Sequence, residues 1–201
     1  GGLLSAAVAL GLVAYNARAA APEDALPFPG PRIRTHLAPP DFALRDQRGA
    51  PASLADYRGK VVLVTGVYAL CTTACPQILQ QIRRTLDALP AAVRAEIHVA
   101  ALSLDPDYDT AELMAAVAEG HGFSYPQFRY LNGEARALGD VLDRFSFSRQ
   151  RNRATGRIEH SNLFVLLDRH GEIAYRLSLE PRHAPWLAAA LTELAAEPAP
   201  R

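Results

Sequence analysis

The sequence predicts an α/β fold, a mixed central sheet with helices on both faces and a hairpin at its N-terminal end. Two observations predict it. Short apolar, β-branched runs alternate along the chain with longer segments of helical periodicity, which is typical of parallel strands joined by right-handed crossovers. Near the C-terminus, two apolar runs are separated only by a short turn at 169–171, and such a connection adds an antiparallel hairpin at the edge of the sheet.

Length and composition are those of one globular domain with an appendage. The 201 residues are 49% hydrophobic and 21% charged, which excludes a disordered or collagen-like chain. Lys plus Arg number 21 and Asp plus Glu number 21, so the chain has no net charge. A protein that coats nucleic acid needs a surplus of cations, so nucleic acid is not an expected partner. Two cysteines exclude a disulfide framework and a four-thiolate zinc site.

The first forty residues are expected to lie outside the domain. Residues 1–15 form an uncharged run that is shorter than the ~20 residues of a membrane-spanning helix. We interpret residues 1–17 as part of a membrane anchor or as a signal segment; a buried helix of the domain is the third interpretation. Six prolines between residues 22 and 40 make residues 18–40 a semi-rigid linker. The folded domain is then expected over residues 41–197, exported and tethered to a membrane.

The first half of the domain contains a hairpin, two strands and a helix. Residues 42–54 alternate around a glycine-containing turn, which predicts the hairpin. Residues 60–67 form a β-branched apolar run of the kind that is buried on both faces of a sheet. Apolar residues then recur at helical spacing over 74–89, and Pro90 ends that helix. Residues 96–104 predict the second buried strand.

The second half continues the alternation. Asp109, with Glu112 three residues later, resembles a capping box and predicts a helix over 110–119. The later elements are a strand over 127–131, a helix from its cap Asn132 to Phe145, the hairpin within 161–179 and an amphipathic helix over 183–196. In sheets of this class the reactive site lies at the carboxyl ends of the strands, so we expect chemistry in the loop after 60–67.

Both cysteines of the chain lie in that loop. Cys71 and Cys75 are four residues apart, where the strand gives way to the helix, and Pro76 suits the first helical turn. On a helical turn their Cα atoms are ~6 Å apart, which fits a disulfide or two sulfur ligands of one soft metal ion. A helix N-terminus also lowers the pKa of a thiol. The alternatives without a chemical role are that both cysteines are buried small hydrophobic residues, or that they form one inert disulfide, whose short loop would add little stability.

A soft cation such as Cu(I) also accepts an imidazole as a third ligand. Five of the six histidines are simply explained as surface, turn or strand residues: His36, His98, His121, His170 and His183. His160 differs because it ends a polar loop directly before the apolar strand at 162–167, where the loop could pass over the cysteines. The residues alone leave two interpretations of His160 open, a functional ligand or a capping and surface residue.

Three motifs together resemble the Sco/SenC family over residues 40–195. They occur in the family's order: CxxxCP at Cys71–Pro76, Ser103–Pro106 followed by Asp109 and Thr110, and His160-Ser161 leading into a strand that ends at Leu167-Asp168. The opening at 41–54 and the lead into the first buried strand are similar to that family as well. The combination is specific, although no single motif would be.

The resemblance implies a thioredoxin-like fold, anchored by one N-terminal helix and facing the periplasm or the intermembrane space. It implies a copper ion, Cu(I) or also Cu(II), with Cys71, Cys75 and His160 as its ligands. It further implies delivery of copper to the Cu(A) centre of cytochrome c oxidase subunit II, or to another copper or thiol protein.

Two other functions fit the same residues. One is an enzyme, a thiol–disulfide oxidoreductase in which Cys71 attacks and Cys75 resolves, acting on the cysteines of a Cu(A)-type or other exported protein. Thioredoxin-type reductants have two residues between their cysteines and a cis-proline facing them, whereas this chain has three residues and no proline over 157–162. That difference favours metal binding. The other is a redox or copper sensor that signals through a partner.

Some residues near these motifs depart from the family or have a simpler explanation. Residues 68–70 lack the threonine and second aromatic residue that are common before the first cysteine. Asp105 and Asp109 match the family's acidic loop, but we interpret them first as turn and helix-cap residues. The loop before His160 carries four arginines, Arg149, Arg151, Arg153 and Arg157. It is either a solvated hairpin or a docking patch for an acidic partner.

Overall fold

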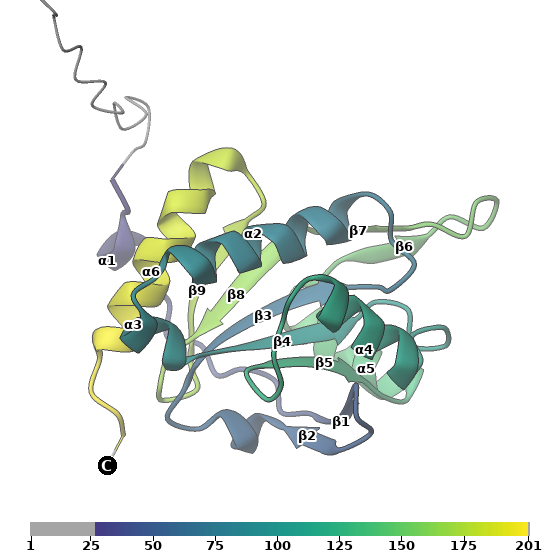
Figure 1. Ribbon diagram of the computed structural model, residues 1–201, viewed down its shortest axis with the longest axis horizontal. Helices are drawn as coiled ribbons and strands as arrows, with labels where there is room; N and C mark the ends of the chain where they lie inside the picture. The colour runs from purple at the N-terminus through teal and green to yellow at the C-terminus, as the bar shows by residue number, and fades with distance from the viewer. Residues whose placement is uncertain (1–26, 201) are drawn as a thin grey trace, which may run out of the picture.

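The computed structural model describes residues 27–200, which form a mixed sheet flanked by helices (Figure 1). The predicted anchor or signal segment at residues 1–17 lies outside the described residues, as does the beginning of the linker. Among residues 27–200, no helix has both the length and the apolar character to cross a membrane.

The described elements alternate as the sequence predicts. The strands are β1 (Ala43–Asp46), β2 (Pro51–Ser53), β3 (Val61–Val67), β4 (Ile97–Ser103), β5 (Phe128–Asn132), β6 (Arg149–Arg151), β7 (Ile158–His160), β8 (Leu163–Leu167) and β9 (Ile173–Ser178). The helices are α1 (Gly30–Ile33), α2 (Ala74–Ala88), α3 (Ala91–Ala95), α4 (Ala111–Gly120), α5 (Ala135–Arg144) and α6 (Ala184–Ala196), with short 3₁₀ turns η1 (Leu54–Tyr57) and η2 (Pro181–His183).

Seven strands form the central sheet in the order β2-β1-β5-β4-β3-β8-β9. Strands β3, β4 and β5 are parallel, whereas β8 runs antiparallel to β3 and β9 antiparallel to β8. Every residue of β3 is buried, as its continuous apolar run predicts. The predicted mixed α/β fold is therefore confirmed, with the β1–β2 hairpin at one edge and the β8–β9 hairpin at the other.

Helix α2 places the cysteine loop. Its apolar residues recur every three or four positions, and the buried ones include Ile78, Leu79, Ile82 and Leu86. Because α2 is the crossover between the parallel strands β3 and β4, its first turn lies beyond the carboxyl end of β3. Helix α6 packs beside α2 (Figure 1).

The N-cap residues of two helices differ from the sequence prediction. The N-cap of α4 is Thr110, whose side chain accepts a hydrogen bond from the backbone N–H of Leu113. The predicted capping box at Asp109 is wrong, because that carboxylate is buried and accepts hydrogen bonds from other elements. Helix α5 is capped by Glu134, since the Asn132 amide instead donates to backbone carbonyls of the β4–α4 loop.

The polar segment before His160 forms a separate hairpin. Strands β6 and β7 pair only with each other and project at one end of the molecule (Figure 1). Arg149 pairs in register with His160, and Arg151 with Ile158, so these four side chains share one face of the hairpin. A two-stranded ribbon is marginally stable by itself. Contacts of its side chains with the body of the domain therefore decide where the hairpin lies.

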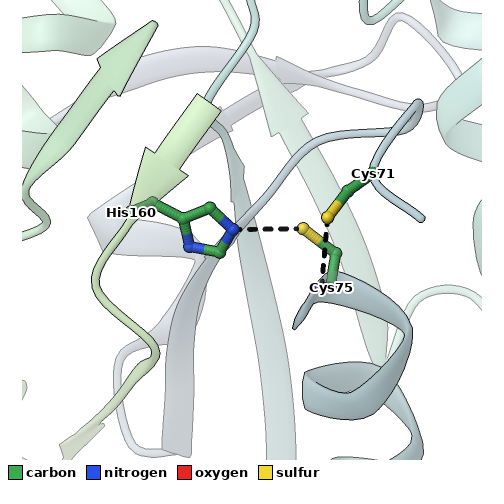
Figure 2. A group of neighbouring side chains, drawn as sticks. All are labelled: Cys71, Cys75 and His160. Carbon is green, nitrogen blue, oxygen red and sulfur yellow. Dashed lines mark hydrogen bonds between the residues drawn. The ribbon is translucent and has the colours of Figure 1, made fainter. Parts of the chain in front are cut away.

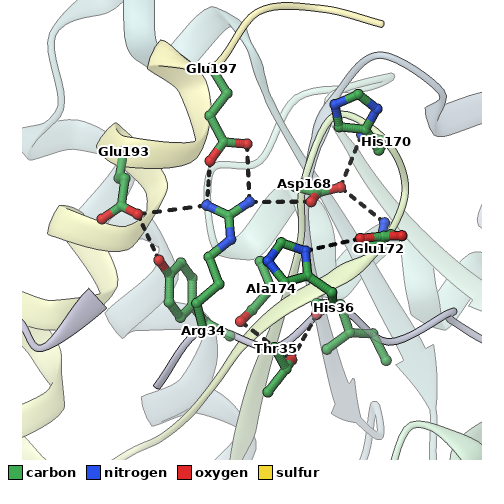
Figure 3. A network of polar contacts seen from close by, with 11 residues as sticks. Arg34, Thr35, His36, Asp168, His170, Glu172, Ala174, Glu193 and Glu197 are labelled. Atoms are coloured by element: carbon green, nitrogen blue, oxygen red, sulfur yellow. Dashed lines mark hydrogen bonds and ion pairs between the residues drawn. The ribbon is translucent and has the colours of Figure 1, made fainter. Parts of the chain in front are cut away.

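The last residues of the predicted linker lie along the sheet edge. The backbone N–H of Thr35 donates to the carbonyl of Ala174 over 2.8 Å, and Leu37 bridges to Ile173 of β9. The Arg34 guanidinium donates to Glu197, at the end of α6, and to Asp168 (Figure 3). The described chain thus begins beside α6, at the end of the sheet away from the β6–β7 hairpin (Figure 1).

Candidate metal centre

The fold brings together the three residues that the sequence analysis singles out. Cys71 lies in the loop after β3, Cys75 in the first turn of α2, and His160 at the end of β7 (Figure 2). His160 precedes β8, which runs antiparallel to β3, so it arrives at the same end of the sheet as the cysteines. The pairing of β8 with β3 therefore brings Cys75 and His160 together, although they are 85 residues apart in the sequence.

The distances suit a single metal ion. Cys75 Sγ is 3.5 Å from His160 Nε2, and both free thiols and the imidazole nitrogen lie within 4.8 Å of one another. A point equidistant from three atoms 4.8 Å apart is about 2.8 Å from each, so shifts of about half an ångström reach metal–sulfur bond lengths. Two thiolates and an imidazole form a soft donor set, which selects Cu(I) or Zn(II) over Mg(II) or Ca(II).

The imidazole is oriented for metal binding. His160 Nδ1 lies 3.2 Å from the backbone carbonyl oxygen of Ser161. A carbonyl only accepts hydrogen bonds, so this contact places the ring proton on Nδ1 and leaves the Nε2 lone pair directed at Cys75. The ring of Tyr68 meets the imidazole edge-on, with centroids 5.9 Å apart, which restricts rotation of the ring.

The two thiols differ in acidity. Burial opposes ionisation of Cys71, but hydrogen bonds from the Cys75 thiol and from the backbone N–H groups of Cys75 and Thr73 outweigh it and lower the pKa of Cys71 to about 6. The Cys75 N–H lies 3.3 Å from the Cys71 sulfur, as expected for a free donor at a helix N-terminus. Burial, and then the hydrogen bond that Cys75 gives to Cys71, raise the pKa of Cys75 well above its ordinary value.

The buried carboxylate of Asp109 fixes the position of the cysteine loop. Asp109 Oδ1 accepts a hydrogen bond from the backbone N–H of Ala69, two residues before Cys71. Its Oδ2 accepts from Ser103 Oγ at 2.6 Å and from Tyr130 Oη at 2.8 Å. Burial raises the pKa of Asp109, and these three donors oppose that shift. The network ties the cysteine loop to β4 and β5.

Ion pairs fix the hairpin that carries His160. Arg151 pairs with the buried Asp105 in the loop after β4, and Arg149 pairs with Asp143 of α5 over 2.6 Å. The Tyr68 hydroxyl also accepts a hydrogen bond from the backbone N–H of Ile158. Together these contacts hold the inner face of the hairpin over the cysteines.

A second cluster of possible ligand atoms lies at the sheet edge but is a poor cation site. His36, Asp168 and Glu172 have ligand atoms within 4.8 Å of one another. One oxygen of Asp168 already accepts from the Arg34 guanidinium and the other from two backbone N–H groups (Figure 3). A cation there would lie next to a fixed positive charge.

The family model described as SCO1/SenC matches residues 32–195 of the chain. The chain belongs to the SCO1/SenC family. A bovine relative, "Protein SCO2 homolog, mitochondrial", is 31% identical over 104 residues, which are 50% of this chain and 37% of that protein. "Protein sco1" of Schizosaccharomyces pombe is 24% identical over 85% of this chain and 66% of its own length. The chain thus spans less than two thirds of these relatives.

Solved structures of SCO1/SenC proteins share the fold. A SCO1/SenC family lipoprotein from Bacillus anthracis matches with a TM-score of 0.71 at 21% identity, over 81% of this chain and 97% of that one. Bradyrhizobium japonicum ScoI with copper bound matches with a TM-score of 0.65 at 24% identity, over 78% and 99%. Yeast Sco1 with copper bound matches with a TM-score of 0.61 at 20% identity, over 71% and 80%. The expected thioredoxin-like fold is confirmed.

Sequence reasoning about this SCO1/SenC chain missed the residues that support the site. The sequence predicts a cap role for Asp109 and a turn role for Asp105. Asp105 does begin the turn before α4, but both carboxylates are buried, and they hold the cysteine loop and the hairpin. Two acidic residues within a turn that follows a buried strand were the available signal. Their hydrogen-bond donors come from distant elements, so the signal could not be interpreted locally.

Proposed function

We propose that this SCO1/SenC chain is a copper chaperone that binds copper through Cys71, Cys75 and His160. It delivers the ion to the Cu(A) centre of cytochrome c oxidase subunit II. The observation that carries the proposal is the triangle of two thiols and one imidazole, whose ligand atoms lie within 4.8 Å. Support comes from relatives described as copper-bound, in Bradyrhizobium japonicum and yeast.

Transfer proceeds by ligand exchange and leaves the oxidation state of Cu(I) unchanged. Cys71 is largely a thiolate at neutral pH, because its pKa is about 6, so it supplies the first ligand without losing a proton. Cys75 loses its proton when copper binds, since metal ligation requires the thiolate. Bonds to an incoming pair of acceptor thiolates form as those to His160 and the two sulfurs break. Of the three proposed ligands, His160 alone lies on the projecting β6–β7 hairpin, whereas Cys71 lies in the loop before α2 and Cys75 in its first turn.

The domain is proposed to face the periplasm, or the intermembrane space, with residues 1–17 as a membrane anchor or signal segment. The Bacillus anthracis relative is described as a lipoprotein, which supports an exported, membrane-attached domain. The strap at residues 34–37 attaches the linker at the end of the sheet away from the hairpin (Figure 1). The described chain therefore begins at the other end of the sheet from the β6–β7 hairpin, which carries His160.

Copper titration of the reduced protein tests the proposal. We expect one Cu(I) per chain, loss of tight binding in Cys71→Ser and Cys75→Ser, and at least about tenfold weaker binding in His160→Ala. The matched control is His121→Ala, which removes an imidazole at the end of α4 and should bind copper as the wild type does. Equal affinity of His160→Ala and wild type would eliminate the three-ligand site.

The contrast between the two thiols favours a second candidate, a thiol–disulfide oxidoreductase. Cys71 is acidic and attacks a protein disulfide; Cys75 then resolves the mixed disulfide, leaving Cys71–Cys75 oxidised and the partner's two thiols reduced. Turnover against an oxidised Cu(A)-site protein tests it. Turnover retained in His160→Ala would support this candidate, because the imidazole is dispensable for exchange. Absence of turnover in the wild type would remove it.

A further inference from the structure

A groove of about 320 Å³ opens beside the metal centre. It lies between the loop that precedes Cys71, the loop after β4 and the tip of the β6–β7 hairpin. Leu70, the chain neighbour of Cys71, forms part of its wall. A molecule in this groove would therefore contact the residue next to a copper ligand.

Two exposed apolar side chains line the groove. Leu70 is 61% exposed and Tyr108 is 58% exposed, the two most exposed large hydrophobic residues in the part of the chain that the structure describes. They come from different loops and meet at one groove. Large apolar side chains left in water at one place are typical of surfaces that bind another protein.

The charge of the groove is positive. Arg151 and Arg157 line it, and its one carboxylate, Asp105, is buried and already paired with Arg151. Arg153, at the tip of the hairpin, is exposed. Among residues 27–200, Arg153 and Arg157 have no ion-pair partner, whereas Arg149 and Arg151 are both paired. Two of the four arginines thus fix the hairpin, and two leave their charge available.

We propose that Leu70, Tyr108, Arg153 and Arg157, here called the groove surface, bind an acidic segment of the protein that exchanges copper with this chain. That segment carries an apolar side chain for the groove and carboxylates for the two arginines, next to the thiols that receive the ion. The inference rests on the proposed chaperone function and names the chemistry of its partner. Because Leu70 directly precedes Cys71, docking here brings the partner's thiols to the metal centre.

A membrane surface fits these observations less well. Binding to anionic lipid is typical of clusters of about four to eight basic residues, and the groove surface has two unpaired arginines. An acidic protein segment needs only a few complementary charges to be steered into place.

Copper transfer from the loaded protein tests the groove surface. The variant is Arg153→Gln with Arg157→Gln; the matched control is Arg32→Gln with Arg58→Gln, two exposed arginines remote from the hairpin that lose the same charge. Two acceptors are compared, the soluble Cu(A) domain of a subunit II and a small dithiol that has no docking surface. Anionic vesicles serve as a separate binding probe.

We expect the groove variant to transfer copper to the protein acceptor about tenfold more slowly at low ionic strength, and at the control's rate in ~0.5 M salt. Transfer to the small dithiol should not change. A second variant, Leu70→Ser, should slow transfer to the protein at both salt concentrations, because its contact is apolar.

Specific outcomes would overturn the inference. Equal rates for the groove variant and wild type, or an equal loss in the control, would show that these arginines do not dock the partner. Binding to vesicles that is lost in the groove variant, with unchanged transfer to protein, would assign the surface to lipid. If the wild type does not bind copper at all, the chaperone proposal fails instead, and the titration separates that failure from the failure of docking.

Discussion

The acidity of Cys71 is tested by moving the pH of the reduced, metal-free protein across its predicted midpoint. Hydrogen bonds from the Cys75 thiol and from backbone N–H groups at the start of α2 hold the pKa of Cys71 at about 6, against the opposing effect of burial. Burial and its own hydrogen bond keep Cys75 protonated throughout the neutral range. The two thiols should therefore react at very different pH values.

The expected difference in ionisation between Cys71 and an ordinary cysteine follows from the lowered pKa of Cys71. A pKa of about 6 makes Cys71 ~90% thiolate at pH 7, whereas an ordinary cysteine thiol with a pKa of about 8.5 is only ~3% ionised there. Alkylation by iodoacetamide at different pH values, followed by mass spectrometry of the peptide over 71–75, measures each thiol. We expect a half-maximal rate near pH 6 for Cys71 and a single adduct per chain at pH 7.

Thr73→Val is the matched variant. It removes a hydroxyl 3.7 Å from the Cys71 sulfur but keeps the backbone donors, so the midpoint should rise by about half a pH unit. A Cys71 midpoint near pH 8.5 in the wild type would refute the proposed role of the helix N-terminus. Faster modification of Cys75 than of Cys71 would refute the assignment of the attacking thiol.

Four further predictions concern the residues around the site and the strap. Arg151→Gln frees the hairpin that carries His160, so copper affinity in a competition titration should fall about three- to tenfold, and loss of the charged partner of the buried Asp105 carboxylate should lower the free energy of unfolding by about 1–3 kcal/mol. Asp109→Asn turns an amide N–H toward one of three donors and should lower the free energy of unfolding in urea by about 1–3 kcal/mol. Arg34→Ala removes hydrogen bonds to two carboxylates and should cost about 2 kcal/mol in the same assay. The lowered pKa of Cys71 stabilises the fold at pH 9 and above, and this contribution should be lost as the pH falls through about 6, measured as the stability difference from Cys71→Ser.

Controls for these predictions come from matched positions. Arg153→Gln removes an unpaired arginine of the same hairpin and should leave copper affinity unchanged; an equal loss would contradict the role of the Arg151 ion pair. Asp107→Asn alters an exposed carboxylate of the same loop and should change stability by less than ~0.5 kcal/mol. Arg182→Ala breaks an exposed ion pair with Glu180 and should cost less than ~0.5 kcal/mol, so a loss equal to that of Arg34→Ala would refute the role of the strap. A stability difference between wild type and Cys71→Ser that stays constant from pH 9 to pH 5 would refute the linkage.

Much of the fold could be predicted because its signals are local. The apolar run of β3 and the periodic apolar positions of α2 each report burial within a few residues, and both predictions are confirmed. The start of α4 was predicted to within one residue, but its cap residue was not. Asp109 has the spacing of a capping residue, but donors from three other segments recruit its carboxylate, and Thr110 takes the cap instead.

The position of the β6–β7 hairpin also depends on contacts that local sequence signals do not report. Its arginines have no apolar alternation that would predict a strand, and the ribbon is held by ion pairs to residues far away in the sequence. Composition therefore left two interpretations of the arginines open. The structure divides them into two that fix the hairpin and two without an ion-pair partner among the described residues.

The sequence by itself determined the order of strands and helices, the position of Cys71 and Cys75 at a strand-to-helix turn, and the soft chemistry of that pair. Only the tertiary structure decided that His160 completes the group. The spacing of residues in the sequence predicts contacts only over about one helical turn, whereas His160 is 85 residues away from Cys75 in the sequence. That distance closes because β8 pairs antiparallel with β3, which returns the chain to the end of the sheet where α2 begins.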